Sequence, residues 1–275
     1  MKTKVIKKIP TIIACLALII GVCMLAYPTI ADAVNSFTQS RAIAGYTQAV
    51  ESMDSNASRA ALDEARAYNA GLIGNAHRFS PTEEEQDKYS SLLDITGTGV
   101  MGYIEIPAID VRMPIYHGTS DAVLQVGIGH MVGSSLPVGG EGTHSVLSGH
   151  SGLVSARILT DLEKVEMGDT FTIHVLDEIL TYRVDQIKTV LPEEVDDLEI
   201  VQGEDHVTIV TCTPYGVNSH RLLVRGERIP TPETPEETEP IPDYRTFDMA
   251  WMLIAILAVI AVAVVIAIIT RKKRK

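Results

Sequence analysis

The stretch His206-Val-Thr-Ile-Val-Thr-Cys-Thr-Pro-Tyr-Gly-Val-Asn-Ser-His-Arg-Leu-Leu-Val-Arg-Gly226 contains two β-rich runs separated by a segment with a proline, a glycine and an asparagine. Such a segment is typical of a long hairpin loop, so the two runs are predicted to pair as antiparallel strands. If the pairing is symmetric about the centre of the loop, Cys212 lies opposite Arg221. Arg225 points to the same face but lies about 13 Å farther along, at roughly 3.3 Å per residue.

Short β-rich runs separated by glycine, proline and aspartate fill the chain from Gly99 to Arg228. Besides the hairpin these runs are 102–106, 111–115, 145–148, 170–175 and 180–187, with short helices expected near 122–126 and 156–162. Several short strands at this spacing predict a mainly β domain, either a barrel or a sandwich.

The segment from about Ala33 to Leu93 has a different residue composition and is predicted to be helical and polar. The run 59–67 is rich in good helix formers, and Pro81-Thr-Glu-Glu-Glu-Gln86 has the pattern of a capped helix start. Between them, 71–80 contains two glycines, an asparagine and a serine before proline, which indicates a loop.

Both ends of the chain carry apolar stretches long enough to cross a bilayer as helices. Residues 9–30 follow four lysines, and residues 249–270 contain no charge and precede the basic run 271–275. The positive-inside rule therefore predicts both termini in the cytoplasm and the segment between them outside. Ala31-Asp-Ala33 also has the form of a cleavage site, so the first stretch could instead be a cleaved signal peptide.

The predicted organisation has six parts. They are an N-terminal signal or anchor segment (1–33), a helical extension (34–98), a β domain (99–228), a Pro/Glu-rich extended stalk (229–248), a transmembrane helix (249–270) and a basic cytoplasmic tail (271–275).

The segment between the apolar ends is strongly acidic. It keeps 14 of the 23 basic residues and all 35 acidic ones, for a formal charge of −21. Such a domain is repelled by nucleic acid and by anionic lipid head groups, so neither is an expected partner.

Cys212 is a candidate nucleophile. The other two cysteines, Cys15 and Cys23, lie in the N-terminal apolar stretch, so the exported domain has no pair with which to form a disulfide. A thiol is mostly protonated at neutral pH, and a working nucleophile needs an imidazole or a cation nearby. Arg221, opposite in the predicted hairpin, would place a fixed charge where an oxyanion develops. Without the cysteine it would be read as an ordinary arginine on a solvated face.

Eight histidines compete to assist Cys212. His150 is modestly favoured because a β-rich run ends in glycines around it, which displays a side chain at a strand end. His144 precedes the same strand, and His206 and His220 flank the hairpin of the cysteine. A single histidine is more often structural, so the residues alone leave these alternatives open.

Three groups of motifs resemble the class C, pilus-assembling sortases of Gram-positive bacteria. They are Thr211-Cys-Thr-Pro-Tyr-Gly-Val-Asn-Ser-His-Arg-Leu-Leu-Val-Arg-Gly226, Gly142-Thr-His-Ser-Val-Leu-Ser-Gly-His150, and the flanking stretches 135–142 and 161–169. The terminal anchors and the helical extension fit the same resemblance. The likeness assigns the family's His, Cys and Arg roles to His150, Cys212 and Arg221, and not to His144.

The resemblance implies an eight-stranded sortase β-barrel with short helices, an N-terminal helical lid extension and flanking transmembrane segments. It implies a cysteine transpeptidase that uses no cofactor and no metal. The expected substrates are pilin subunits that carry a Leu-Pro-x-Thr-Gly-like sorting signal and an acceptor lysine. The expected location is the cell membrane, with the catalytic domain outside and the C-terminal tail in the cytoplasm.

One stretch departs from the family pattern. Many class C sortases carry an Asp-Pro-aromatic triplet in the loop between the N-terminal helices, as a lid over the cysteine, but here the loop reads Gly74-Asn-Ala-His-Arg-Phe-Ser-Pro81. Phe79 could supply the aromatic plug, with His77 or Arg78 as a polar latch. The alternative is a shorter or more mobile loop in which Phe79 packs locally.

Other functions fit parts of the sequence. A sortase that anchors proteins to the peptidoglycan cross-bridge would use the same chemistry with a different amine. A membrane-tethered adhesion or scaffold module with an inert barrel would leave Cys212 unreactive. A thiol protease is a weaker enzyme alternative, because the resemblance leaves little room for a papain-type arrangement.

Overall fold

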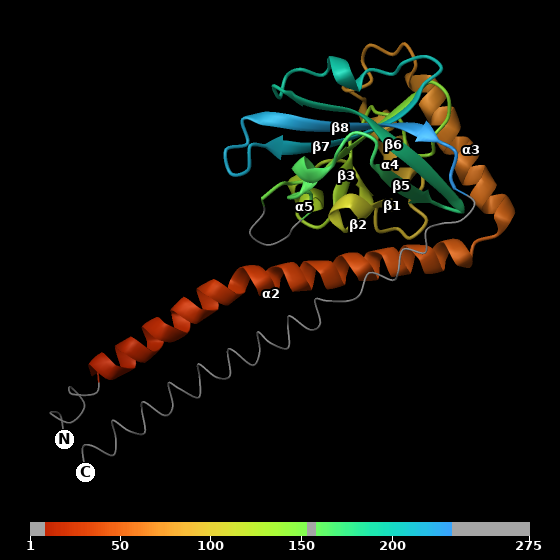
Figure 1. The fold of residues 1–275 in the computed structure, drawn as a ribbon. Helices are drawn as coiled ribbons and strands as arrows, with labels where there is room; N and C mark the ends of the chain where they lie inside the picture. The colour runs from red at the N-terminus through yellow and green to blue at the C-terminus, as the bar shows by residue number, and fades with distance from the viewer. Residues whose placement is uncertain (1–8, 153–157, 233–275) are drawn as a thin grey trace. The chain divides into compact units, whose positions relative to one another are not determined.

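A computed structural model describes residues 9–152 and 158–232 of the chain (Figure 1). Within these residues, eight strands close into a barrel in the order β1-β2-β3-β4-β7-β8-β6-β5. The strands are β1 (Val100–Ile106), β2 (Val111–His117), β3 (Ile128–His130), β4 (Thr143–Ser148), β5 (Thr170–Val175), β6 (Glu178–Val190), β7 (Asp205–Thr213) and β8 (His220–Ile229). The pairs β2–β3 and β4–β7 are parallel, and the other neighbours are antiparallel.

Alternating apolar residues build the interior of the barrel, as a half-buried strand requires. On β5, Phe171 and Ile173 are buried, and the ring of Phe171 stacks on that of Tyr182 from β6 at 5.5 Å between centroids. Gly226 on β8 faces this pair, and a Cβ there would lie 2.7 Å from the Phe171 ring. A glycine is therefore needed at this close approach.

The helices are α2 (Ile9–Glu51), α3 (Ser55–Leu72), α4 (Glu83–Ser91) and α5 (Asp121–Leu124), and three short 3-10 turns are η1 (Pro107–Ile109), η2 (Leu162–Lys164) and η3 (Asp196–Leu198). The start of α4 has the capping box that the sequence predicts. The Thr82 side chain accepts from the Glu85 backbone, and the Glu85 carboxylate accepts from the Thr82 backbone at 2.8 Å.

The described residues from 35 to 232 belong to one compact unit, so the helical extension and the barrel belong together. Buried polar side chains of the helices satisfy backbone groups of the barrel. Tyr46 of α2 donates to the Met101 carbonyl at 3.0 Å and accepts from the Leu176 amide at 2.7 Å. Asn69 of α3 pairs with both backbone groups of Leu136, at 3.0 and 2.7 Å. These directional hydrogen bonds, together with apolar contacts, fix the position of the helices on the barrel.

The apolar N-terminal helix fits a membrane segment. A portion of α2 beginning at Leu16 is long and apolar enough to span a bilayer, and its exposed side chains include Met24 and Leu25. The helix continues without a break through Ala31-Asp-Ala33 and ends at Glu51. The predicted transmembrane helix 249–270, the basic tail and most of the stalk lie outside the described residues.

The structure confirms the mainly β barrel, and the predicted strand runs fall within β1, β2, β4, β5, β6, β7 and β8. Strand β3, which has only three residues, was not predicted. One local expectation is wrong. The helix expected near 156–162 is absent where the chain is described: residues 158–161 form bends and turns, followed by η2. Residues 156 and 157 lie outside the described part.

Candidate active site

Cys212 lies one residue from the end of β7, on the outer face of the barrel. The strand alternates: Val207 and Ile209 point into the core, so Val210 and Cys212 lie on alternating outer positions. The thiol is free and half-buried. Its own carbonyl accepts a hydrogen bond from Ser151 Oγ, which ties the end of β7 to the turn after β4.

Arg221 lies directly opposite Cys212 in the β7–β8 hairpin, as the sequence register predicts. Its Nη1 donates to the carbonyls of His220, at 3.1 Å, and Asn218, at 3.3 Å. No carboxylate among residues 9–152 and 158–232 forms an ion pair with it. Its charge is therefore held by backbone dipoles and stays available to an anion beside the thiol.

The loop between the strands has the geometry to hold Arg221 in this way. The Pro214 carbonyl accepts from the amides of Val217 and Asn218, both at 3.0 Å. Gly216 and Asn218 have positive φ angles of 76° and 59°. Glycine and asparagine are the residues that tolerate this conformation, which explains their presence in the loop.

His150 follows the end of β4, the parallel neighbour of β7. The ladder pairs Ser148 with Val210, and two further contacts extend it: the Gly149 amide donates to the Val210 carbonyl at 3.0 Å, and Thr211 Oγ1 donates to the Gly149 carbonyl at 2.8 Å. The next step of the same register brings His150 level with Cys212, on strands that lie about 4.8 Å apart.

Gly149 permits this arrangement because a Cβ there would lie 2.7 Å from Leu159 and 2.9 Å from Ile128. The His150 carbonyl accepts from the Leu159 amide at 3.0 Å, which fixes the backbone of the histidine. Its imidazole is half-exposed and makes no hydrogen bond to another described residue. The backbone of His150 is thus fixed, while its two ring nitrogens have no hydrogen-bond partner within the described residues.

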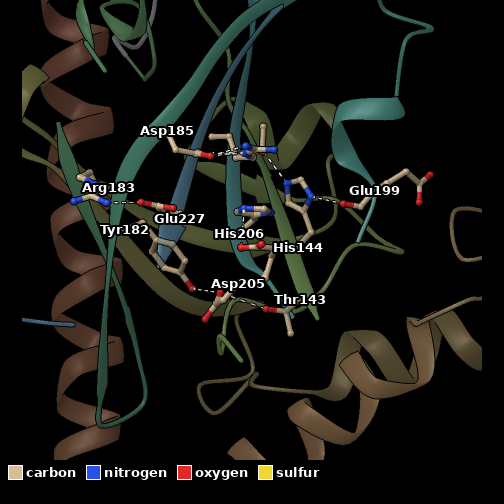
Figure 2. Close-up of polar contacts among 12 residues, drawn as sticks. Thr143, His144, Tyr182, Arg183, Asp185, Glu199, Asp205, His206 and Glu227 are labelled. Carbon is tan, nitrogen blue, oxygen red and sulfur yellow. Dashed lines mark hydrogen bonds and ion pairs between the residues drawn. The ribbon is translucent and has the colours of Figure 1, made fainter. Parts of the chain in front are cut away.

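His144 has the opposite environment, near the start of β4. Its Nδ1–H donates to the Glu199 carbonyl at 2.8 Å, so its Nε2 accepts from Thr208 Oγ1 at 2.7 Å. Burial lowers the pKa of His144 to about 4. It lies six residues before His150, or about 20 Å along an extended strand, so it is too far away to serve Cys212. Figure 2 shows His144 between its partners.

The remaining competing histidines also have structural partners. His206 packs edge-on against His144, with 5.5 Å between ring centroids, and burial lowers its pKa. His220 Nδ1 lies 2.9 Å from Ser219 Oγ, within the hairpin loop. Among the described residues no group of three or more His, Cys, Asp or Glu side chains is arranged to hold a metal ion.

The three candidate lid residues lie in the connection between α3 and α4. Arg78 is buried, with 7% of its surface exposed, and its guanidinium lies over the Phe79 ring at 4.3 Å from the centroid. Phe79 is 39% exposed. His77 is exposed, and its amide donates to Asn75 Oδ1 at 2.9 Å. The contacts of Arg78 are to Gly133, Leu198 and Glu199, so a plug over Cys212 stays a prediction.

Several groups that shape the site were not predicted from the sequence. Ser151 holds the Cys212 carbonyl, and Thr213 donates to Glu163 at 2.6 Å. Tyr215 packs its ring on Gly152, where a Cβ would meet it at 2.7 Å. These contacts join segments about 50 to 63 residues apart, and no local pattern in the sequence predicts them.

The arrangement can perform acyl transfer. The strand register places Cys212 of β7, His150 after β4 and Arg221 of β8 at neighbouring positions, and within the described residues Arg221 has no counter-ion. The set provides a nucleophile, a proton carrier and an anion stabiliser. This is the minimum set for forming and resolving a thioester.

Comparisons with known proteins point to one family. A family model described as the sortase domain matches residues 104–229. Sortase C1 of Streptococcus agalactiae is 51% identical and superposes with a TM-score of 0.68, over 70% of this chain and 100% of that one. Sortase C of Clostridium perfringens, solved with the C-terminal cell wall sorting motif, is 42% identical with a TM-score of 0.62, over 70% and 100% of the two chains.

A curated relative matches at lower identity. Sortase A of Streptococcus agalactiae serotype III is 29% identical over 131 residues, which are 46% of this chain and 52% of that protein. The chain therefore spans about half the length of this relative.

Proposed function

This chain belongs to the sortase family, to its class C, and from that premise we propose that it joins pilin subunits through lysine isopeptide bonds. The substrate carries a Leu-Pro-x-Thr-Gly-like sorting signal, which is cleaved between Thr and Gly. The observation that carries the proposal is the strand register, with Cys212 opposite Arg221 and level with His150.

In the first half-reaction the Cys212 thiolate attacks the carbonyl carbon of the substrate threonine and forms a C–S bond. The carbonyl oxygen becomes an oxyanion, which the Arg221 guanidinium stabilises. Collapse of this intermediate breaks the Thr–Gly bond. The His150 imidazolium gives its proton to the departing glycine amine, and a thioester remains on Cys212.

In the second half-reaction the side-chain amine of a lysine on another subunit attacks the thioester. His150, now neutral, takes the proton from the attacking nitrogen. Collapse forms the isopeptide bond and releases the Cys212 thiolate, with His150 again protonated. The cycle consumes no oxidant or reductant and returns the enzyme to its starting state.

The proposed location follows from the apolar segments. The described helix α2 supplies one membrane anchor, and the acidic unit from residue 35 onward lies outside the cell. Segment 249–270 supplies a second anchor, with the basic tail 271–275 in the cytoplasm. The partners are then pilins at the outer surface of the cell membrane.

A second candidate function is attachment of proteins to the peptidoglycan cross-bridge. It is favoured by the curated relatives named sortase A and sortase D, at 26–29% identity. The structural neighbours named sortase C have 42–51% identity, which favours the pilin reaction. The two functions share Cys212, His150 and Arg221 and differ in the acceptor amine.

A competition experiment distinguishes them. The detergent-solubilised full-length chain is incubated with a Leu-Pro-x-Thr-Gly peptide and equal amounts of a lysine peptide with a blocked N-terminus and a cross-bridge peptide with a free N-terminus. We expect mass spectrometry to show the lysine isopeptide product, absent with Cys212→Ala. A product with the cross-bridge amine instead would establish the second function. Neither product and no thioester would refute a transpeptidase acting on this signal.

A further inference from the structure

Arg78 is a buried cation supplied to the barrel by the helical extension. Its Nη2 donates to the Leu198 carbonyl at 3.2 Å and to Glu199 Oε2 at 3.0 Å, and its Nη1 to the Gly133 carbonyl at 3.4 Å. The Arg78 side chain is 5% exposed, whereas that of Glu199 is 63% exposed. A buried guanidinium persists only where its donors are matched, and here most of the matching groups are backbone carbonyls of two separate loops.

The backbone of Arg78 packs closely against Gly133. Gly133, in the β3–β4 connection, has φ +86°, and a Cβ there would lie 2.1 Å from the Arg78 carbonyl oxygen and 3.0 Å from the Phe79 Cα. Any other residue at 133 would displace the segment. Arg78 therefore bridges the β3–β4 connection and η3, and the Phe79 ring lies against its guanidinium.

The turn η3 packs on the face of the sheet that carries Cys212. Leu198 is 4% exposed and belongs to a small apolar cluster with Val146, Val210 and Leu223. Val210 lies two residues from Cys212 and Leu223 two residues from Arg221, which is about 7 Å along each strand. A shift of η3 therefore changes the space beside the thiol and the guanidinium.

Other contacts of this turn come from the barrel itself. Asp197 binds Gln186 at 3.2 Å and also pairs with Lys188, both on β6, and the Glu199 carbonyl accepts from His144 on β4. Arg78 is the tether that reaches η3 from the helical extension. It links a segment early in the chain to the active-site face across 120 residues.

We propose that Arg78 is a positioning residue that fixes η3 beside Cys212 and so sets how tightly the sorting signal is bound. The inference rests on the proposed function for its substrate, but the position of η3 is measurable without any reaction. The helical extension thereby contributes to recognition of the sorting signal by positioning η3, in addition to packing on the barrel.

The test compares Arg78→Met with Arg66→Met in the full-length chain. Arg66 is the matched control, because it also links the extension to the barrel, but through an ion pair at 2.7 Å with Glu178 at the start of β6 rather than through η3. Four quantities are measured: hydrogen exchange of the amides in 195–201, KM for the sorting peptide, kcat for the same peptide, and the rate at which a small reagent alkylates Cys212.

For Arg78→Met we expect about tenfold faster exchange in 195–201, a KM raised about tenfold, and kcat and alkylation within about twofold of the parent. Arg66→Met leaves all four unchanged. Unchanged exchange in Arg78→Met would overturn the proposal whether or not the chain is a transpeptidase. Alkylation accelerated more than about tenfold, with exchange unchanged, would also overturn it and identify the segment as a cover over the thiol.

Glu199→Gln is the second variant, and it keeps the test decisive if Arg78→Met does not fold. It removes the charge from an exposed side chain while leaving both carbonyl acceptors of Arg78 in place. We expect exchange in 195–201 and KM to rise about twofold to threefold. No change in the exchange of that segment would contradict the tether.

Discussion

The same outer face of the barrel carries two polar clusters of similar composition, about 13 Å apart along strands β7 and β8. They are named the Thr208 end and the Cys212 end of this face. At one end a histidine from β4 and an arginine from β8 lie beside Thr208. At the other end a histidine after β4 and an arginine from β8 lie beside Cys212. Figure 2 shows the first end, where His144 is enclosed by hydrogen-bond partners.

The two ends differ in how completely their groups are satisfied. At the Thr208 end, His144 uses both ring nitrogens, and Arg225 forms a bidentate pair with Asp185, with Nε at 3.1 and 3.2 Å from the two oxygens. At the Cys212 end, the described residues give the His150 ring no hydrogen-bond partner and Arg221 no counter-ion. A satisfied polar group stabilises the fold, whereas one left open can act on a substrate.

The largest expected effect is that of Cys212→Ala. Removal of the nucleophile should abolish peptide cleavage, a loss of at least about 10⁴-fold in kcat/KM, with little change in stability. Thr208→Val, at the other end of the same strand, should keep activity within about threefold. Steady-state cleavage of a quenched sorting peptide measures both. Retained turnover in Cys212→Ala would contradict the assignment of catalysis to the Cys212 end.

The next effect is that of Arg221→Gln. Loss of the charge beside the oxyanion should lower kcat by about 10²- to 10³-fold, with KM changed less than about fivefold. Arg225→Gln is the matched variant on the same strand and face, and its kcat should stay within about threefold. Equal losses of kcat in the two variants would mean that Arg221 has no special role.

Lowering the pH should reduce the stability of the fold, in part through the buried His144 at the Thr208 end. The pKa of His144 is lowered to about 4 by burial, as is that of His130, against 6.5 for the unfolded chain. Between pH 6.5 and 4 the unfolded state binds more protons, so the stabilisation present above pH 6.5 is lost as pH falls. Each histidine should cost roughly 2 kcal/mol at pH 5. Urea unfolding at pH 7 and pH 5 measures this loss.

His144→Gln is the control for that experiment. It should be less stable than the parent at pH 7, and its stability should fall less between pH 7 and pH 5, because one of the histidines with a lowered pKa is gone. A fall as steep as that of the parent would show that His144 does not stay neutral in the folded state.

A smaller effect is expected for Arg225→Met. This variant leaves Asp185 unpaired at a position where both side chains are 21% exposed, so the free energy of unfolding should fall by about 1–2 kcal/mol. Thermal unfolding measures this, and Arg221→Met should change stability by less than about 0.5 kcal/mol. A reversed order would contradict the assignment of one arginine to the fold and the other to chemistry.

The hairpin and its register could be predicted from the sequence, because a strand pair joined by one loop has few alternatives. The loop 214–219 centres the pairing, which places Cys212 opposite Arg221 as expected. The capping box of α4 is likewise a local pattern. Strand β3 was not predicted because three residues, one of them glycine, carry too little periodicity.

The choice between His144 and His150 could not be made from local pattern. Both lie on the same face of one strand run, six residues apart, and the partners that satisfy His144 come from 55 and 64 residues away. The buried position of Arg78 depends on partners 55 to 121 residues distant. Such contacts are set by the closure of the barrel and the docking of the helices, which no short window of sequence contains.

The most direct test of the account is the rate of thioester formation in a single turnover, followed by intact mass, for the parent, His150→Gln and His144→Gln. We predict that His150→Gln slows the appearance of the acyl adduct on Cys212 by at least about 10²-fold. His144→Gln, compared at pH 7 where it is folded, should form the adduct within about threefold of the parent rate. Equal slowing by the two substitutions, or slowing by His144→Gln alone, would contradict the claim that chemistry resides at the open end of this face.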